Sequence, residues 1–218
     1  MNNEKIRYRV TFEKKNLARF VGHLDLQTLF QRALKRAGVP VAYSQGFNPH
    51  MLISFAQPLP LGMESLCEMV DIEVTREIEP IEFAAKLNES LPVGFTVLSA
   101  ELLSPQTKRV AAAVYAATYS ATLNLSDVEM QDNPSIAERI IAAIAYVSSG
   151  NEPYEAIAEK IISMEFDQQN DTINMTLRAG GEKNLKPVLA VSAVCEKAGV
   201  ELTAGLVNYT RLEILLKQ

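Results

Sequence analysis

A chain of 218 residues with 48% hydrophobic and 22% charged residues has the composition of an ordinary globular protein with one or two domains. No run approaches the roughly 18 apolar residues of a membrane-spanning helix, and two cysteines, Cys67 and Cys195, are too few for a disulfide framework. Residues 1–10 are polar and begin a strand rather than a secretory signal peptide. We therefore expect a cytoplasmic protein that does not associate with a membrane.

Positive charge is concentrated at the N-terminal end of an otherwise acidic chain. Residues 1–60 hold nine Lys or Arg residues and three acidic residues, a net charge of +6, whereas the whole chain carries −5, so the remaining residues carry −11. A local basic field attracts anionic partners. The alternative is chance clustering of basic side chains on solvated faces.

The first half contains six predicted segments in the order strand, helix, strand, strand, helix, strand. Apolar residues alternate in the strands, and in the first helix they recur at steps of three and four residues up to Gly38. The predicted strands are residues 5–13, 51–56, 66–74 and 95–103, and the predicted helices are residues 23–37 and 79–91. The packed face of the second helix is expected to comprise Ile81, Phe83, Ala84 and Leu87.

The second half repeats this order after a short predicted linker at residues 104–108. Its predicted strands are residues 114–123, 161–166, 172–177 and 206–216, and its predicted helices are residues 134–147 and 185–198. The apolar face of its first helix is expected to comprise Ile136, Ile140, Ile141 and Ile144. This order is typical of the ferredoxin-like split fold. We therefore predict an α+β protein of two ferredoxin-like halves with antiparallel sheets, as domains at residues 1–104 and 110–218.

The start of the first helix carries a histidine and a carboxylate in the sequence G-H-L-D at residues 22–25. Free backbone N–H groups at a helix start attract anions. Arg32 and Arg36 lie four residues apart on one face of the same helix. Together with Arg19 and His23, they predict a surface that binds phosphate. The structural alternative is a capping cluster in which the imidazole is packed.

Residues 43–50 form the most unusual loop of the chain, with two aromatic rings, two amides, a hydroxyl and an imidazole within eight residues. Aromatic rings stack on bases and amides form hydrogen bonds with base edges, so this composition favours binding of a nucleic acid. The candidate binding residues are Tyr43, Ser44, Gln45, Phe47, Asn48 and His50. The structural alternative is a turn that places its two aromatic rings in the core.

Motifs for metal binding and catalysis are absent from the sequence. Metal ligands could come from His23, His50, Asp25, Glu68 and Asp71, but no H-x-x-x-H or H-E-x-x-H spacing occurs. We therefore expect no metal and no other cofactor. For an enzymatic function, His23 and His50 are the candidate acid–base catalysts, with Asp25 as the residue that orients them. No G-x-S-x-G or nucleotide-binding glycine motif is present.

Two arginines of the first strand have two alternative roles. In the predicted topology, the strand that carries Arg7 and Arg9 pairs with the strand that carries Asp71 and Glu73. The arginines either contact RNA or form cross-strand ion pairs with these carboxylates. The sequence favours neither role.

Four segments carry a resemblance to one family. They are F-V-G-H-L-D at residues 20–25, R-A-L-K-R-A at residues 32–37, Y-S-Q-G-F-N-P-H at residues 43–50 and P-L-G-M-E-S at residues 60–65. In them the chain resembles the radical-SAM-linked (radical-SAM-associated) family of unknown function, in its standalone form. The resemblance implies an accessory role near RNA or ribosome metabolism, and it adds Glu64 and Ser65 to the candidate binding residues.

A radical SAM enzyme binds its iron–sulfur cluster through three cysteines, and this chain has two that lie 128 residues apart. The chain is therefore not the radical enzyme, and we lean against an enzymatic activity of its own. We predict an accessory module that recognises RNA or another anionic substrate for a separate radical SAM enzyme, or that acts with ribosomal components. The alternatives are an enzyme acting on RNA or a small molecule through His23 or His50, and a protein-interaction module.

Overall fold

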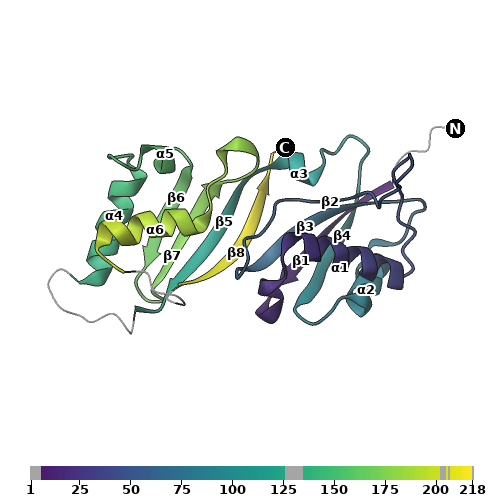
Figure 1. The fold of residues 1–218 in the computed structure, drawn as a ribbon, viewed down its shortest axis with the longest axis horizontal. Helices are drawn as coiled ribbons and strands as arrows, with labels where there is room; N and C mark the ends of the chain where they lie inside the picture. The colour runs from purple at the N-terminus through teal and green to yellow at the C-terminus, as the bar shows by residue number, and fades with distance from the viewer. Residues whose placement is uncertain (1–5, 126–134, 202–204, 206, 218) are drawn as a thin grey trace. The chain divides into compact units, whose positions relative to one another are not determined.

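The computed structural model describes residues 6–125, 135–201, 205 and 207–217 (Figure 1). The chain divides into two compact units, residues 1–114 with 216–218 and residues 115–215. Each unit is an α+β structure built on antiparallel strand pairs. No described helix has the length and apolar character that crossing a bilayer requires. Three predicted element ends, at residues 5, 134 and 206, lie outside the described residues.

The first unit contains all six elements that the sequence periodicity predicts, with two short helices in addition. Its strands are β1 (Ile6–Lys14), β2 (Ile53–Phe55), β3 (Glu64–Val74) and β4 (Phe95–Leu103). Its helices are the 3₁₀-helix η1 (Asn16–Phe20), α1 (His23–Arg36), α2 (Pro80–Ser90) and α3 (Val110–Ala113). The strands pair antiparallel in the order β4-β1-β3-β2.

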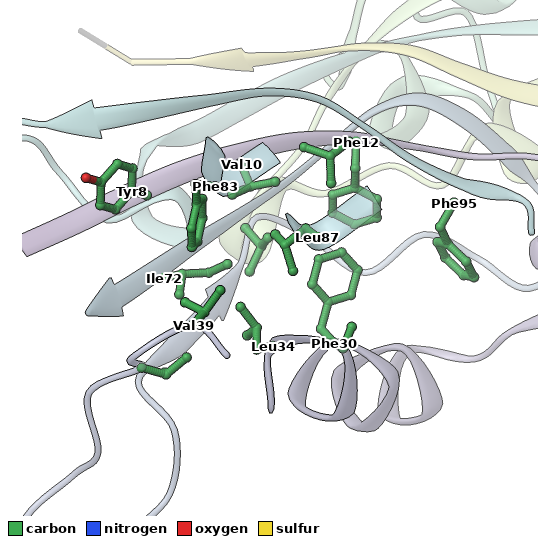
Figure 2. Close-up of a cluster of buried hydrophobic side chains, with 14 of the residues drawn as sticks. Tyr8, Val10, Phe12, Phe30, Leu34, Val39, Ile72, Phe83, Leu87 and Phe95 are labelled. Atoms are coloured by element: carbon green, nitrogen blue, oxygen red, sulfur yellow. The ribbon is translucent and has the colours of Figure 1, made fainter. Parts of the chain in front are cut away.

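Helices α1 and α2 cover one face of this sheet, because alternate strand residues and one stripe of each helix are apolar. Figure 2 shows the buried side chains of this core. Phe30 is fully buried, and its ring centroid lies 4.7 Å from that of Phe12. Helix α2 contributes Phe83 and Leu87. The prediction that Ile81 packs in this core was wrong, since 86% of the residue is exposed. Ile81 precedes Phe83 by two positions and therefore points away from the buried face.

A buried ion pair joins β1 and β3 on the face opposite the helices. Arg9 donates to both carboxylate oxygens of Asp71, with Nε–Oδ1 at 2.8 Å and Nη2–Oδ2 at 3.1 Å. The strand register places these two residues directly opposite each other. Arg9 therefore forms a cross-strand ion pair, which is one of the two roles that the sequence left open for it.

The predicted linker at residues 104–108 is held by β1. Arg7 donates to the backbone carbonyl of Thr107, and Arg9 donates to that of Lys108 at 3.1 Å. These hydrogen bonds join residues about a hundred positions apart, so local sequence patterns do not reveal them. The segment is therefore part of the first unit rather than a free connection.

Two carboxylates of β3 hold the residues that follow this segment. The backbone amide of Val110 donates to Asp71 Oδ2 at 2.7 Å. Arg109 forms an ion pair with Glu73, whose side chain is buried while the arginine remains about half exposed. Successive side chains of a strand point to opposite faces of the sheet. Strand β3 therefore places apolar side chains in the core on one face and these two carboxylates against the arginines on the other.

The second unit also contains the predicted elements. Its strands are β5 (Val114–Leu123), β6 (Ile161–Asp167), β7 (Thr172–Arg178) and β8 (Val207–Leu216), in the order β8-β5-β7-β6. Its helices are α4 (Ile136–Ser148), α5 (Glu155–Ala158), the 3₁₀-helix η3 (Gly181–Lys183) and α6 (Pro187–Ala198). Ser135 and Glu138 form a capping box that begins α4. The prediction that Ile141 lies on the buried face of α4 was wrong, since Ile141 is 41% exposed. The buried row of this helix is formed by Ile136, Ile140 and Ile144, which follow one another at steps of four residues.

Candidate functional site

The first turn of α1 places His23 against the sheet. The imidazole meets the ring of Phe55 edge-on, with 5.8 Å between the centroids, and its Nε2 lies 3.0 Å from Gln27 Nε2. Gln27 is one helical turn further along, so the spacing of four residues brings the two side chains together. Gly22 begins the helix and has no side chain with which to cap it. His23 therefore packs against Phe55. The backbone N–H groups of the first turn of α1, where His23 lies, have no carbonyl partner within the helix.

Arg32 and Arg36 line a depression of about 440 Å³ on the exposed side of α1. Asp25 and Thr28 line the same depression from the preceding turns. Arg36 also donates to the backbone carbonyl of Ser90 at 2.6 Å, which ties α1 to the end of α2. Two guanidinium groups and one carboxylate leave this depression with a net positive charge, which suits the oxygens of a phosphate group.

Three further candidate residues make contacts within the fold. The guanidinium of Arg19 lies 4.9 Å from the ring centroid of Phe20. Glu64 Oε1 accepts a hydrogen bond from the backbone amide of Asn16 at 2.8 Å, where the chain has a left-handed φ of 55°. Ser65 is fully buried, and its hydroxyl accepts from the Cys67 amide at 3.2 Å. Glu64 and Ser65 thus stabilise η1 and the beginning of β3.

Residues 43–51 form a hairpin whose base is closed by hydrogen bonds. Tyr43 and Met51 form an antiparallel bridge, and the Ser44 amide donates to the His50 carbonyl at 2.8 Å. The side chains reinforce this closure, because Ser44 Oγ lies 2.8 Å from His50 Nδ1 and accepts from the His50 amide at 3.1 Å. The predicted loop therefore has a defined conformation at its base.

The tip of this hairpin presents an aromatic side chain to solvent. Phe47 is fully exposed, and Tyr43 at the base is 44% exposed. Gln45 and Asn48 are exposed on either side of Phe47 in the sequence. Neither aromatic ring belongs to the core of the first unit, so the alternative of a turn with two core aromatics is wrong.

The contact between Ser44 and His50 lacks the third member of a catalytic triad. Among the described residues, no carboxylate contacts the His50 imidazole, whose Nδ1 lies against the Ser44 hydroxyl. Asp25, the predicted orienting residue, lines the depression on α1 with the two arginines. The structure thus brings Asp25 together with the candidate phosphate-binding residues rather than with His50.

No metal centre is formed by the part of the chain that the structure describes. Within it, no group of three or more His, Cys, Asp or Glu side chains could hold a metal ion. Of the ligands considered, Asp71 binds Arg9 and the amide of Val110, and His23 packs on Phe55. These carboxylate and imidazole groups contribute to the structure of the first unit.

A groove of about 630 Å³ lies beside the base of the hairpin. Val41, Leu52 and Val74 are among its apolar walls, and Tyr43 and Gln45 line it from the hairpin. The hairpin residues stand out in the sequence through their unusual composition. The wall residues do not, because they resemble the apolar residues of any buried strand and reach the groove only through the tertiary fold.

The described part of the second unit contains a buried thiol, a partly buried phenol and a buried guanidinium group. Burial raises the pKa of the Cys195 thiol to about 11, so the thiol stays protonated at neutral pH and is a poor nucleophile. The pKa of Tyr209 is raised to about 12, mainly by burial and to a smaller extent by the proximity of Cys195. Arg211 is fully buried and donates to the Tyr119 hydroxyl at 3.2 Å.

Together, the fold and the site define an α+β protein that presents an aromatic hairpin beside a groove and a basic depression. The chain belongs to the family described as an uncharacterized protein conserved in bacteria (DUF2344), whose family model matches residues 7–187. The match includes the hairpin, both arginines of the depression and most of the second unit. No curated protein matches the chain.

Proposed function

We propose that this protein is a binding module for RNA, in which the hairpin of residues 43–51 contacts unpaired bases. The observation that carries the proposal is a fully exposed Phe47 on a hairpin whose base is closed by hydrogen bonds. An exposed aromatic ring gains by stacking on a base, and the closed base of the hairpin limits the loss of conformational entropy on binding. Gln45 and Asn48 supply donors and acceptors for base edges.

The depression on α1 is proposed to hold the phosphate groups of the same ligand. Arg32 and Arg36 provide two guanidinium groups, which form paired hydrogen bonds with phosphate oxygens. Such contacts position a nucleic acid without reading its sequence. Residues 1–60 carry a net charge of +6 and include both arginines, and this local charge would draw an anionic ligand toward that part of the first unit.

We further propose that the module acts in the cytoplasm as an accessory to a separate radical SAM enzyme, and that each unit is ferredoxin-like. The resemblance of residues 20–25, 43–50 and 60–65 supports the first proposal, together with a cysteine content too low for a radical SAM cluster. The strand orders β4-β1-β3-β2 and β8-β5-β7-β6 support the second, since the split fold places its first and third strands at the centre.

Replacing Arg32 with alanine is expected to weaken the salt dependence of RNA binding, because one phosphate contact is lost. For a single strand, the slope of log K against log salt concentration should become less steep by about 0.7. Titrations of a fluorescent single-stranded RNA at several salt concentrations measure this slope. Lys35→Ala is the matched control, since Lys35 is also exposed on α1 but does not line the depression. Equal slopes for the two variants would contradict the phosphate role of Arg32.

Replacing Phe47 with alanine is expected to lower RNA affinity on the order of tenfold, because the stacked ring is lost. The midpoint of urea unfolding should not change, since Phe47 is fully exposed. The same titration measures the affinity, and Ile81→Ala serves as a control that removes an exposed apolar side chain from α2. An unchanged affinity for Phe47→Ala would exclude the hairpin tip from the RNA-binding surface, and no RNA binding by the unmodified protein would refute the proposed function.

A further inference from the structure

Two depressions of the first unit meet at one residue of β3. The groove beside the hairpin and a second depression of about 330 Å³ are both lined by Glu73. Arg7, Arg109 and Ser104 also line the second depression. The volumes of both depressions fall in the range of roughly 300–1,000 Å³ that is usual for small-molecule sites. The two depressions therefore form adjoining compartments with different chemistry.

The groove compartment suits a flat heterocycle. Its walls include the apolar side chains of Val41, Leu52 and Val74, and Tyr43 lines it with a partly exposed ring. Polar residues line the groove as well, namely Ser44, Gln45, Glu73 and Thr75, and a site that combines apolar walls with polar groups is typical of small-molecule ligands. The amide of Gln45 is the polar group best suited to read the edge of a base.

The compartment lined by arginines suits a phosphate group. Arg7 and Arg109 bring two positive charges against the single carboxylate of Glu73, which leaves the compartment positive. The Nε of Arg7 is buried and has no hydrogen-bond partner in the described part of the chain. A buried donor without an acceptor is costly. Guanidinium groups that line a depression can donate charge-assisted hydrogen bonds to the oxygens of a bound phosphate.

We infer that these adjoining compartments bind one ribonucleoside 5′-monophosphate, with its base in the groove beside Tyr43 and its phosphate against Arg7 and Arg109. This inference rests on the proposed RNA-binding function and names the part of the ligand that the groove would hold. The nucleotide has two sources, a free nucleotide or the 5′-phosphorylated end of an RNA strand. Neither depends on the depression that contains Arg32 and Arg36.

The test is calorimetric titration of the full chain with AMP, GMP, CMP and UMP, each compared with its nucleoside and with inorganic phosphate. At least one monophosphate should bind, and its nucleoside should bind on the order of tenfold more weakly. Tyr43→Leu should weaken binding of the monophosphate about tenfold by removing the stacking ring. Arg109→Lys keeps a positive charge beside Glu73 but loses the planar guanidinium, and it should also weaken binding. Lys35→Ala should bind normally, and circular dichroism should show that every variant is folded.

Binding of RNA oligonucleotides distinguishes a free nucleotide from the 5′ end of an RNA strand as the ligand. It also distinguishes failure of this inference from failure of the proposed RNA-binding function. Tighter binding of a 5′-phosphorylated RNA than of the same RNA with a 5′-hydroxyl would support the inference and identify a strand end as the source. Binding of the free monophosphate with no such preference would also support it and identify a free nucleotide. Salt-sensitive RNA binding without any monophosphate binding would overturn this inference and leave the proposed function standing. Binding of neither RNA nor monophosphate would overturn both.

Discussion

Replacing Asp71 with alanine is expected to lower the free energy of unfolding by about 3–5 kcal/mol, the usual cost of removing one partner of a buried ion pair. The Asp71 side chain is 1% exposed and that of Arg9 is 11% exposed, so water cannot easily replace the lost carboxylate. The amide of Val110 loses its acceptor at the same time. Urea unfolding monitored by circular dichroism measures the change.

Glu82→Ala is the control for this variant. It also removes one carboxylate from an ion pair, here with Lys86 on the surface of α2, where both side chains are well exposed. We expect its unfolding midpoint to match that of the unmodified protein, because exposed ion pairs contribute little to stability. A loss for Asp71→Ala no larger than for Glu82→Ala would show that this carboxylate does not hold Val110 and the start of α3 on β3.

Replacing Phe30 with alanine is expected to destabilise the protein by about 3–5 kcal/mol, because the substitution leaves a cavity at the centre of the first core. The Phe30 ring lies between α1 and the sheet, with ring centroids 4.7 Å from Phe12 and 5.3 Å from Phe55 (Figure 2). Thermal unfolding followed by differential scanning calorimetry measures the loss. A transition that belongs to the first unit should move to lower temperature.

Phe47→Ala is the matched comparison, since it removes the same side chain from a fully exposed position. The two variants should behave in opposite ways. Phe30→Ala should lower stability, whereas Phe47→Ala should leave stability unchanged and lower RNA affinity. Similar thermal transitions for both variants would contradict the burial on which the first expectation depends.

Short-range periodicity was a reliable guide to the helices and strands. Alternation of apolar residues from Ile6 to Phe12 predicted β1, and the spacing from Leu26 to Ala37 predicted α1. Periodicity was less reliable for single residues at the border of an apolar stripe. Ile81 and Ile141 are apolar and close to buried positions, yet both are exposed, because a helix turns through about 100° per residue.

Composition also located the hairpin of residues 43–51, although not its conformation. Eight residues with six chemically distinctive side chains marked this segment as unusual. Whether its aromatic rings lay in the core or in solvent depended on contacts with the rest of the first unit. The bridge between Tyr43 and Met51 and the contacts between Ser44 and His50 decided in favour of an exposed tip.

The sequence by itself determined the α+β class, the order of the elements and the position of the hairpin, because these depend on residues within a few turns of one another. Only the tertiary structure decided that Asp71 binds Arg9, that β1 holds residues 107 and 108 while β3 holds residues 109 and 110, and that one groove joins the hairpin to Val74. These features link residues up to a hundred positions apart. Strand register and packing determine which of these residues come into contact, and neither can be predicted from local sequence patterns.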